Sequence, residues 1–257
     1  MVGIVFLGTG GGRFNLISQI RKTGGFRING SLKIHVDPGP GALASSLQYK
    51  QNAGEIDLLI VTHNHIDHVN DAGLMVEALS PGWKQKKGWL IASKSVIKGD
   101  EKGDKGITAY HLGKLEKHTV AVPGKKIKIG INGKVASILP TNVKHEDETG
   151  FGFVLEMDGK KIGYTSDTEY FEGISKQYKG CDILIANNLK GSEDGIPGHL
   201  YTAATAKLAT EANPKLLLLT HIGISLLQSG PEKEAEKIEK MTGVKTISAV
   251  DGMETIA

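Results

Sequence analysis

An apolar run that ends abruptly in histidines sets narrow limits on how this chain can fold. Residues 57–68 read Asp-Leu-Leu-Ile-Val-Thr-His-Asn-His-Ile-Asp-His, so a segment typical of a buried strand is followed at once by His63, His65, Asp67 and His68. Side chains two residues apart in extended backbone point to the same side, so His63 and His65 can reach one cation together. Asp67 and His68 are adjacent in the sequence, so in extended backbone their side chains point to opposite sides unless a turn follows.

A turn after this segment would leave room for two cations. Asn70 and Asp71 favour a helix start, and a helix is predicted over residues 72–79. This geometry suits two adjacent metals better than one. Imidazole and carboxylate ligands without thiolate indicate zinc, with manganese or iron as alternatives. A loop that is rich in histidine by chance is the competing explanation, and the density of the motif disfavours it.

Composition limits the class of protein. The chain has 257 residues, which is enough for a sizeable core, and its net charge of +3 is too small to argue for nucleic-acid binding by itself. The single cysteine, Cys181, excludes an intrachain disulfide, fits a reducing cytoplasm and reads as a small buried side chain. The N-terminus does not read as a signal peptide, and no apolar run is long enough to span a bilayer. We therefore expect a cytoplasmic globular protein without a membrane partner.

Strand-like and helix-like segments alternate along the whole chain. Strands are predicted at residues 2–7, 31–36, 56–61, 89–92, 119–122, 126–131, 134–139, 151–157, 161–165, 183–186, 216–219 and 245–250, and helices at 41–49, 72–79, 202–212 and 232–241. Asn132-Gly133 and Asp158-Gly159 are type I′ hairpin signals. Residues 8–30 read as a long loop, because Arg13 replaces the third glycine of a dinucleotide-binding loop and no clear helical pattern follows. The mixture predicts two mixed sheets packed face to face with helices outside, in a single domain over residues 1–257.

Three further candidate ligands follow predicted strands. His145 and Asp167 each stand shortly after a strand, and His221 follows the apolar run 216–219 and a threonine, as His63 does. Each residue alone is commonly a surface or turn residue. Their recurrence after buried strands, in a chain that already holds a metal-like cluster, makes them candidate ligands. Three histidines lie outside these patterns and outside the segment 198–202. They are predicted to be structural or surface residues: His35, His111 and His118.

These segments together resemble the five motifs of the metallo-β-lactamase superfamily of metal-dependent hydrolases. Asp37 stands in the first motif, residues 63–68 in the second, and His145, Asp167 and His221 in the third to fifth. The resemblance implies an α+β fold, a four-layer αβ/βα sandwich of two mixed β-sheets flanked by helices. It also implies two divalent metal ions: His63, His65 and His145 would hold one, Asp67, His68 and His221 the other, Asp167 would bridge them, and Asp37 would orient a ligand.

The segment Gly198-His199-Leu200-Tyr201-Thr202 resembles the histidine motif of the phosphodiesterase branch, which includes the tRNA 3′-processing endonucleases and smaller cyclic-phosphate phosphodiesterases. There the histidine faces the scissile phosphate, so His199 is a candidate general acid or charge stabiliser; the alternative is that it merely precedes a helix. Residues 185–189 stand where the tRNA endonucleases carry a His-Glu-Ala-Thr-like segment, and no stretch resembles their tRNA-clamping arm. Acidic residues at 146–148 would also repel a polyanion if they faced the site.

The predicted activity is therefore hydrolysis of a small or cyclic phosphodiester, or of an oligonucleotide, rather than of tRNA. The nucleophile would be a hydroxide shared by two metals, with Asp67 as a ligand that also accepts its hydrogen bond. A lactonase or thioesterase with the same metals is one alternative. A metal-stabilised RNA-binding module is another, since Trp83 and Trp89 flank three lysines, although a solvated turn is a commoner explanation. The apolar segment 222–227 is expected to line the substrate site or to form a subunit contact. A homo-oligomer is therefore an open alternative.

Overall fold

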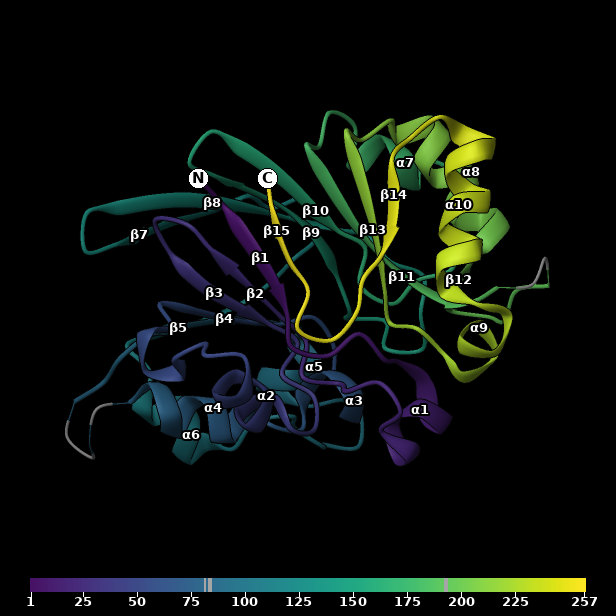
Figure 1. The fold of residues 1–257 in the computed structure, drawn as a ribbon. Helices are drawn as coiled ribbons and strands as arrows, with labels where there is room; N and C mark the ends of the chain where they lie inside the picture. The colour runs from purple at the N-terminus through teal and green to yellow at the C-terminus, as the bar shows by residue number, and fades with distance from the viewer. Residues whose placement is uncertain (81, 83–84, 192–193) are drawn as a thin grey trace.

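Two β-sheets packed face to face, with helices on their outer sides, form the protein (Figure 1). The computed structural model describes residues 1–80, 82, 85–191 and 194–257. Helix, sheet, sheet and helix layers follow one another, which confirms the predicted α+β sandwich. In the described part of the chain, no helix has the length and apolar character needed to cross a membrane.

The first sheet has seven strands within the described residues, in the order β15-β1-β2-β3-β4-β5-β6. Strands β3 to β6 are parallel, whereas β15, β1, β2 and β3 pair antiparallel. The strand bounds are β1 (Gly3–Phe6), β2 (Phe26–Asn29), β3 (Lys33–Val36), β4 (Leu58–Val61), β5 (Trp89–Ala92), β6 (Lys117–Val120) and β15 (Glu254–Ile256).

The second sheet has eight strands within the described residues, seven of them in the order β14-β13-β11-β10-β9-β8-β7, with β12 paired to β11. Its strands are β7 (Ile127–Ile131), β8 (Lys134–Thr141), β9 (Gly152–Met157), β10 (Lys160–Tyr164), β11 (Ile183–Lys190), β12 (Leu200–Tyr201), β13 (Leu216–Thr220) and β14 (Thr246–Ser248). Both residues of the Asn132-Gly133 and Asp158-Gly159 turns have positive φ, as a type I′ turn requires.

Helices cover the outer face of each sheet. Apolar side chains of α2, α4 and α5 pack on β4 and β5, and those of α7, α8, α9 and α10 pack on β11 and β13. The helix bounds are α1 (Gly12–Ser18), α2 (Ala42–Gln48), the 3₁₀ helix η1 (Ala53–Glu55), α3 (Ile66–Val69), α4 (Ala72–Leu79), α5 (Lys94–Lys98), α6 (Ala109–Lys114), α7 (Ile174–Gln177), α8 (Thr202–Ala212), α9 (Ile224–Ser229) and α10 (Pro231–Thr242).

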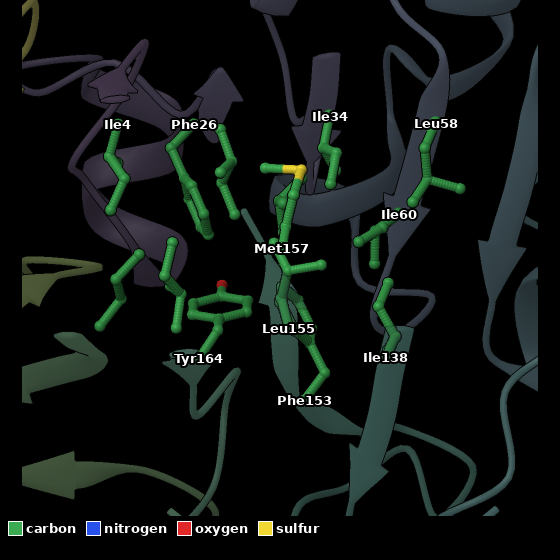
Figure 2. Packing of buried hydrophobic residues seen from close by; sticks show 14 of the residues in the cluster. Ile4, Phe26, Ile34, Leu58, Ile60, Ile138, Phe153, Leu155, Met157 and Tyr164 are labelled. Carbon is green, nitrogen blue, oxygen red and sulfur yellow. The ribbon is translucent and has the colours of Figure 1, made fainter. Parts of the chain in front are cut away.

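The main core lies between the two sheets, where inward-facing side chains of both meet (Figure 2). Strand β4 shows how the sequence achieves this: Leu58 and Ile60 face the core, while Leu59 and Val61 pack under the outer helices. A strand covered on both faces reads as a continuous apolar run, which is why residues 58–61 carry no polar side chain. Cys181 is buried as predicted.

The prediction of a long loop over residues 8–30 is wrong. Residues 12–18 form α1, and residues 26–29 form β2, which pairs with both β1 and β3. Two features hid these elements: α1 exposes Phe14 and Ile17, so it has no ordinary amphipathic pattern, and β2 carries the buried Arg27. Other strands differ from prediction by a few residues at their ends, as β6 does at 117–120.

Candidate metal centre

The predicted ligands stand on loops that follow strands of both sheets. His63, His65, Asp67 and His68 follow β4 directly, and α3 supplies the expected turn. On the second sheet, the predicted ligands at 145, 167 and 221 follow β8, β10 and β13. Three residues at these strand ends, Asp37, Ser166 and His221, adopt left-handed backbone with φ between 50° and 59°. Such conformations cost energy and are common at functional sites.

The structure brings six imidazoles and two aspartates into one cluster, arranged as overlapping groups of three whose ligand atoms lie within 4.8 Å of one another. In the group His63, His65 and His145, the Nε2 atom of His145 lies 3.1 Å from Nδ1 of His65. In the group Asp67, His68 and His221, Nε2 of His221 lies 3.2 Å from Nε2 of His68 and 3.3 Å from Oδ2 of Asp67. The two groups are the two ligand sets expected from the sequence.

Asp167 lies between the two groups. Its Oδ2 atom is 3.3 Å from Nε2 of His221 and 3.4 Å from Nε2 of His68, which belong to one group. The same oxygen is 3.9 Å from Nε2 of His63 and 4.0 Å from Nε2 of His145, which belong to the other. A single carboxylate oxygen therefore faces both groups.

The residues present fit divalent cations. Tetrahedral zinc with bonds of 2.0–2.1 Å to nitrogen places its ligand atoms about 3.3–3.4 Å apart, close to the shorter separations within the cluster. The Nε2 atom of His63 is buried without a hydrogen-bond partner, although buried polar atoms are rarely left unpaired. His145 and His68 donate their Nδ1 hydrogens to the Gly198 carbonyl (2.9 Å) and to Asp37 (3.0 Å), so their Nε2 lone pairs face the cluster.

Asp37 is the centre of a buried hydrogen-bond network behind the cluster. Its Oδ2 atom accepts from His68 Nδ1 (3.0 Å), Thr62 Oγ1 (2.8 Å) and the Tyr164 hydroxyl (2.9 Å), and its Oδ1 atom accepts from the Thr62 amide (2.7 Å). Asn187 extends this network by donating from Nδ2 to Tyr164 and, at 2.6 Å, to Oδ1 of Asp167. The sequence analysis missed Thr62, Tyr164 and Asn187 as supporting residues, because only their positions near strand ends could have indicated them.

Burial and mutual charge perturb the pKa values within the cluster. Burial, together with repulsion from His68, holds the pKa of His63 well below its ordinary value. Burial acts in the same direction on His68, but Asp167, Asp67 and Asp37 outweigh it and raise the pKa of His68. Burial would raise the pKa of Asp167, whereas His221 and His68 lower it strongly. The lowered pKa values of His63 and Asp167 favour the neutral imidazole and the ionised carboxylate, which are the forms that bind a cation, whereas at His68 a cation would displace a proton.

His199 belongs to the cluster but to neither of these two groups, and its ligand atom lies with those of His145 and Asp167 in a further group. Its Nδ1 atom is 3.6 Å from Oδ2 of Asp167, and its ring is stacked on that of His221 with centroids 5.9 Å apart. Its side chain is 18% exposed, compared with 2% for Asp167, so a substrate can reach it. Burial lowers the pKa of His199 to about 4, which keeps the free imidazole neutral at pH 7.

A cleft of about 730 Å³ opens beside His65, whose side chain is 37% exposed. Residues 146–149 line the cleft, and Glu146 places Oε2 at 3.8 Å from Nε2 of His65. Lys94 and Lys98 of α5 also line the cleft. The cleft is therefore of mixed charge, with more carboxylates than ammonium groups.

The tryptophans and the other histidines discussed in the sequence analysis lie away from the candidate metal centre or are held by contacts within the protein, where the structure describes them. Trp89 is buried in β5, donates from Nε1 to Thr119 at 3.0 Å and lies 3.7 Å beneath the ammonium of Lys117, so it is not free to stack on a base. Trp83 lies outside the described residues. His35 is fully buried and contacts the Gly24 carbonyl, which agrees with a structural role.

The fold and the family comparison together define the class of this protein. Residues 33–222 match the family model of the β-lactamase superfamily domain, so the chain belongs to that superfamily. Its members' metal-dependent hydrolysis is the activity class predicted from the sequence, and the assignment confirms that the chain is a metal-dependent hydrolase. The family also implies divalent metal ions, in agreement with the grouped histidines and aspartates.

Individual relatives resemble the chain over nearly its full length. An uncharacterized protein of Methanocaldococcus jannaschii is 37% identical over 98% of this chain and 94% of its own length. Ribonuclease Z of Saccharolobus solfataricus is 26% identical over 86% of this chain and 89% of its own. Among solved structures, the metallo-β-lactamase fold protein YhfI of Bacillus subtilis superposes with a TM-score of 0.79 at 19% identity, covering 99% and 98% of the two chains.

Proposed function

We propose that this protein hydrolyses phosphodiesters with two divalent cations, zinc being the first candidate, and that its substrate is small or cyclic rather than tRNA. The observation that carries the proposal is the position of Asp167, one oxygen of which faces two groups of three ligands while His199 lies beside it. A structural zinc site has four protein ligands, which leave no coordination position open to a substrate. Two open groups and an accessible histidine favour catalysis.

Paired divalent cations supply a nucleophile from water near neutral pH and stabilise charge on a phosphoryl oxygen. The protein's own groups orient the reactants. Asp67 is held in place by the Gly12 amide, which donates to its Oδ2 at 3.2 Å. Burial raises the pKa of Asp67, but His68 and His221 outweigh it and keep the carboxyl ionised. Asp67 therefore orients an attacking water by accepting its hydrogen bond, in addition to its proposed role as a ligand.

His199 is suited to stabilise the leaving oxygen. Its Nδ1 atom faces Asp167, so the Nε2 atom on the other side of the ring is available to a substrate. A neutral imidazole carries a single N–H; because Nδ1 lies 3.6 Å from Asp167, beyond hydrogen-bond distance, that hydrogen can stand on Nε2 and be donated to a developing alkoxide. This supports the charge stabiliser among the two roles that the sequence left open.

Charge near the mouth supports a small substrate. Glu146 is 84% exposed and stands beside His65, where it would repel successive phosphates of a polyanion. Similarity to a ribonuclease Z supports phosphodiester chemistry as such. A small or cyclic diester satisfies both observations, because it brings one negative charge to the cations and no extended backbone to the acidic wall.

The activity of the metal-loaded protein on a panel of substrates tests the proposal. We expect turnover of bis-p-nitrophenyl phosphate and of 2′,3′-cyclic nucleotides that exceeds turnover of lactones and thioesters. Asp167→Ala should lose bound metal and all activity, whereas His199→Gln should keep the wild-type metal content and lower kcat by about 10²–10⁴-fold. Metal content is measured by plasma mass spectrometry.

The outcomes separate the proposal from its alternatives. Preference for lactones or thioesters would replace the phosphodiesterase assignment with a carboxylic ester hydrolase that uses the same site. RNA binding in an electrophoretic shift without turnover of any ester would indicate a binding module. Unchanged metal content in Asp167→Ala would refute the bridging role.

A further inference from the structure

Helix α1 exposes an unusual amount of apolar surface. Phe14 and Ile17 are each 72% exposed, and Ile20, just beyond the helix, is 67% exposed. Phe14 and Ile17 are three residues apart, so they lie next to each other on one face of the helix. Single exposed apolar residues are ordinary, but a contiguous group usually marks a binding surface.

This helix begins at the candidate metal centre. The amide of Gly12, its first residue, donates to Asp67. Gly11 packs directly against His221, since a Cβ added at Gly11 would lie 2.2 Å from the ring. The apolar face therefore starts within two residues of a main-chain contact to a proposed ligand and extends away from it along α1.

Helix α9 lies next to α1. Gly10 forms a parallel bridge with Ile222, and α1 contacts α9, on which Ile224 and Leu227 are partly exposed. We call Phe14, Ile17, Ile224 and Leu227 the α1–α9 lip. Its two helices flank the backbone that carries His221, so the lip is continuous with the site rather than a separate patch.

The size of the exposed surface favours a small occupant. Phe14 and Ile17 of the lip, with Ile20 just beyond α1, together expose on the order of 400 Å², and the two α9 residues are only partly exposed. A specific protein dimer buries about 800 Å² on each partner, roughly twice that area. An apolar group of a bound ester needs no more than one or two side chains of contact.

We propose that the α1–α9 lip binds an apolar substituent of the substrate, so that the preferred phosphodiester carries an aryl or bulky alkyl group on its non-leaving oxygen. This inference rests on the proposed phosphodiesterase function. In an in-line displacement the leaving group departs opposite to the attacking water. Because the lip begins at Asp67, which orients that water, it contacts the substituent that stays on phosphorus.

Two diesters with the same leaving group test the lip. Bis-p-nitrophenyl phosphate and methyl p-nitrophenyl phosphate both release p-nitrophenolate and differ only in the substituent that remains. For Phe14→Ala and Ile17→Ala we expect kcat/KM on the aryl diester to fall by about tenfold, while kcat/KM on the methyl diester changes by less than about twofold. Val135→Ala is the matched control, since Val135 is also 72% exposed but lies near the start of β8, at the end of that strand opposite to the one that leads to His145.

Metal content, thermal melting and molar mass by light scattering accompany the kinetics. Equal losses on both diesters, or no loss on either, would overturn the proposal. So would a wild-type dimer that Phe14→Ala converts to a monomer, because the lip would then be a subunit interface.

Binding measurements separate this inference from the proposed function. If the wild-type protein hydrolyses neither diester, the phosphodiesterase assignment fails, and calorimetry of the metal-loaded protein still tests the lip. Phenylphosphonate should bind about tenfold more tightly than methylphosphonate, and Phe14→Ala should remove the difference while Val135→Ala keeps it. Equal affinities in the wild-type protein would overturn the lip.

Discussion

Replacing Asp37 with asparagine tests whether the network behind the cluster controls metal affinity. Both carboxylate oxygens of Asp37 accept hydrogen bonds, Oδ2 from His68, Thr62 Oγ1 and Tyr164, and Oδ1 from the Thr62 amide. Asparagine has only one accepting oxygen. If its amide group replaces Oδ2, it faces several donors; if it replaces Oδ1, it faces the Thr62 N–H.

Either orientation leaves at least one buried donor without an acceptor, which costs about 1–3 kcal/mol of the free energy of unfolding. His68 also loses the carboxylate that holds its Nδ1 hydrogen and turns its Nε2 lone pair toward the cluster. Loss of such a supporting carboxylate lowers metal affinity by about 10–100-fold. We therefore expect Asp37→Asn to fold, with a lower melting temperature and weaker binding of one metal.

Competition with a fluorescent chelator measures metal affinity, and urea unfolding of the metal-free protein measures the stability change. Asp57→Asn is the matched control, because Asp57 precedes β4 at the end remote from the histidine loop and accepts from the Lys33 amide at 2.9 Å. The reasoning is refuted if Asp37→Asn binds zinc as tightly as the wild-type protein, or if Asp57→Asn weakens zinc binding equally.

Two further predictions concern stability and loop position. Burial and the nearby Arg27 lower the pKa of His35 to about 3, so between about pH 6.5 and pH 3 the unfolded chain binds a proton that the folded chain does not, and stability falls as the pH is lowered. Between about pH 6.5 and pH 4.5, the free energy of unfolding of His35→Gln should therefore fall by about 2–3 kcal/mol less than that of the wild-type protein. Urea unfolding without metal measures this difference, and identical pH slopes for the two proteins would contradict the prediction. Asp147 accepts from the Asn64 amide at 3.0 Å and from Ser95, which joins the His145 loop to the His65 loop. Asp147→Asn should lower the free energy of unfolding by about 1–2 kcal/mol and weaken metal binding, whereas an unchanged melting temperature and zinc affinity would show that the tie is unimportant.

The elements nearest to a simple pattern were predictable from sequence. The apolar run of β4, the helix 202–212 and the two type I′ turns each depend on local periodicity or on single residues with strong backbone preferences. Helix α1 and strand β2 were missed for the opposite reason. Their stability comes from contacts with distant residues, so exposed Phe14 and buried Arg27 contradict the pattern that local reasoning expects.

The order of ligand-bearing segments, and the chemistry of imidazole beside carboxylate, are properties of the sequence alone. They determined the class of the protein and the candidate ligands at 63, 65, 67, 68, 145, 167 and 221. The distances among those groups were decided only by the packing of the two sheets against each other, which brings His221, after β13, to 3.2 Å from His68, after β4. Tertiary structure alone also placed Tyr164 and Thr62 around Asp37 and put α1 at the mouth of the site, because such contacts join residues that share no local repeat.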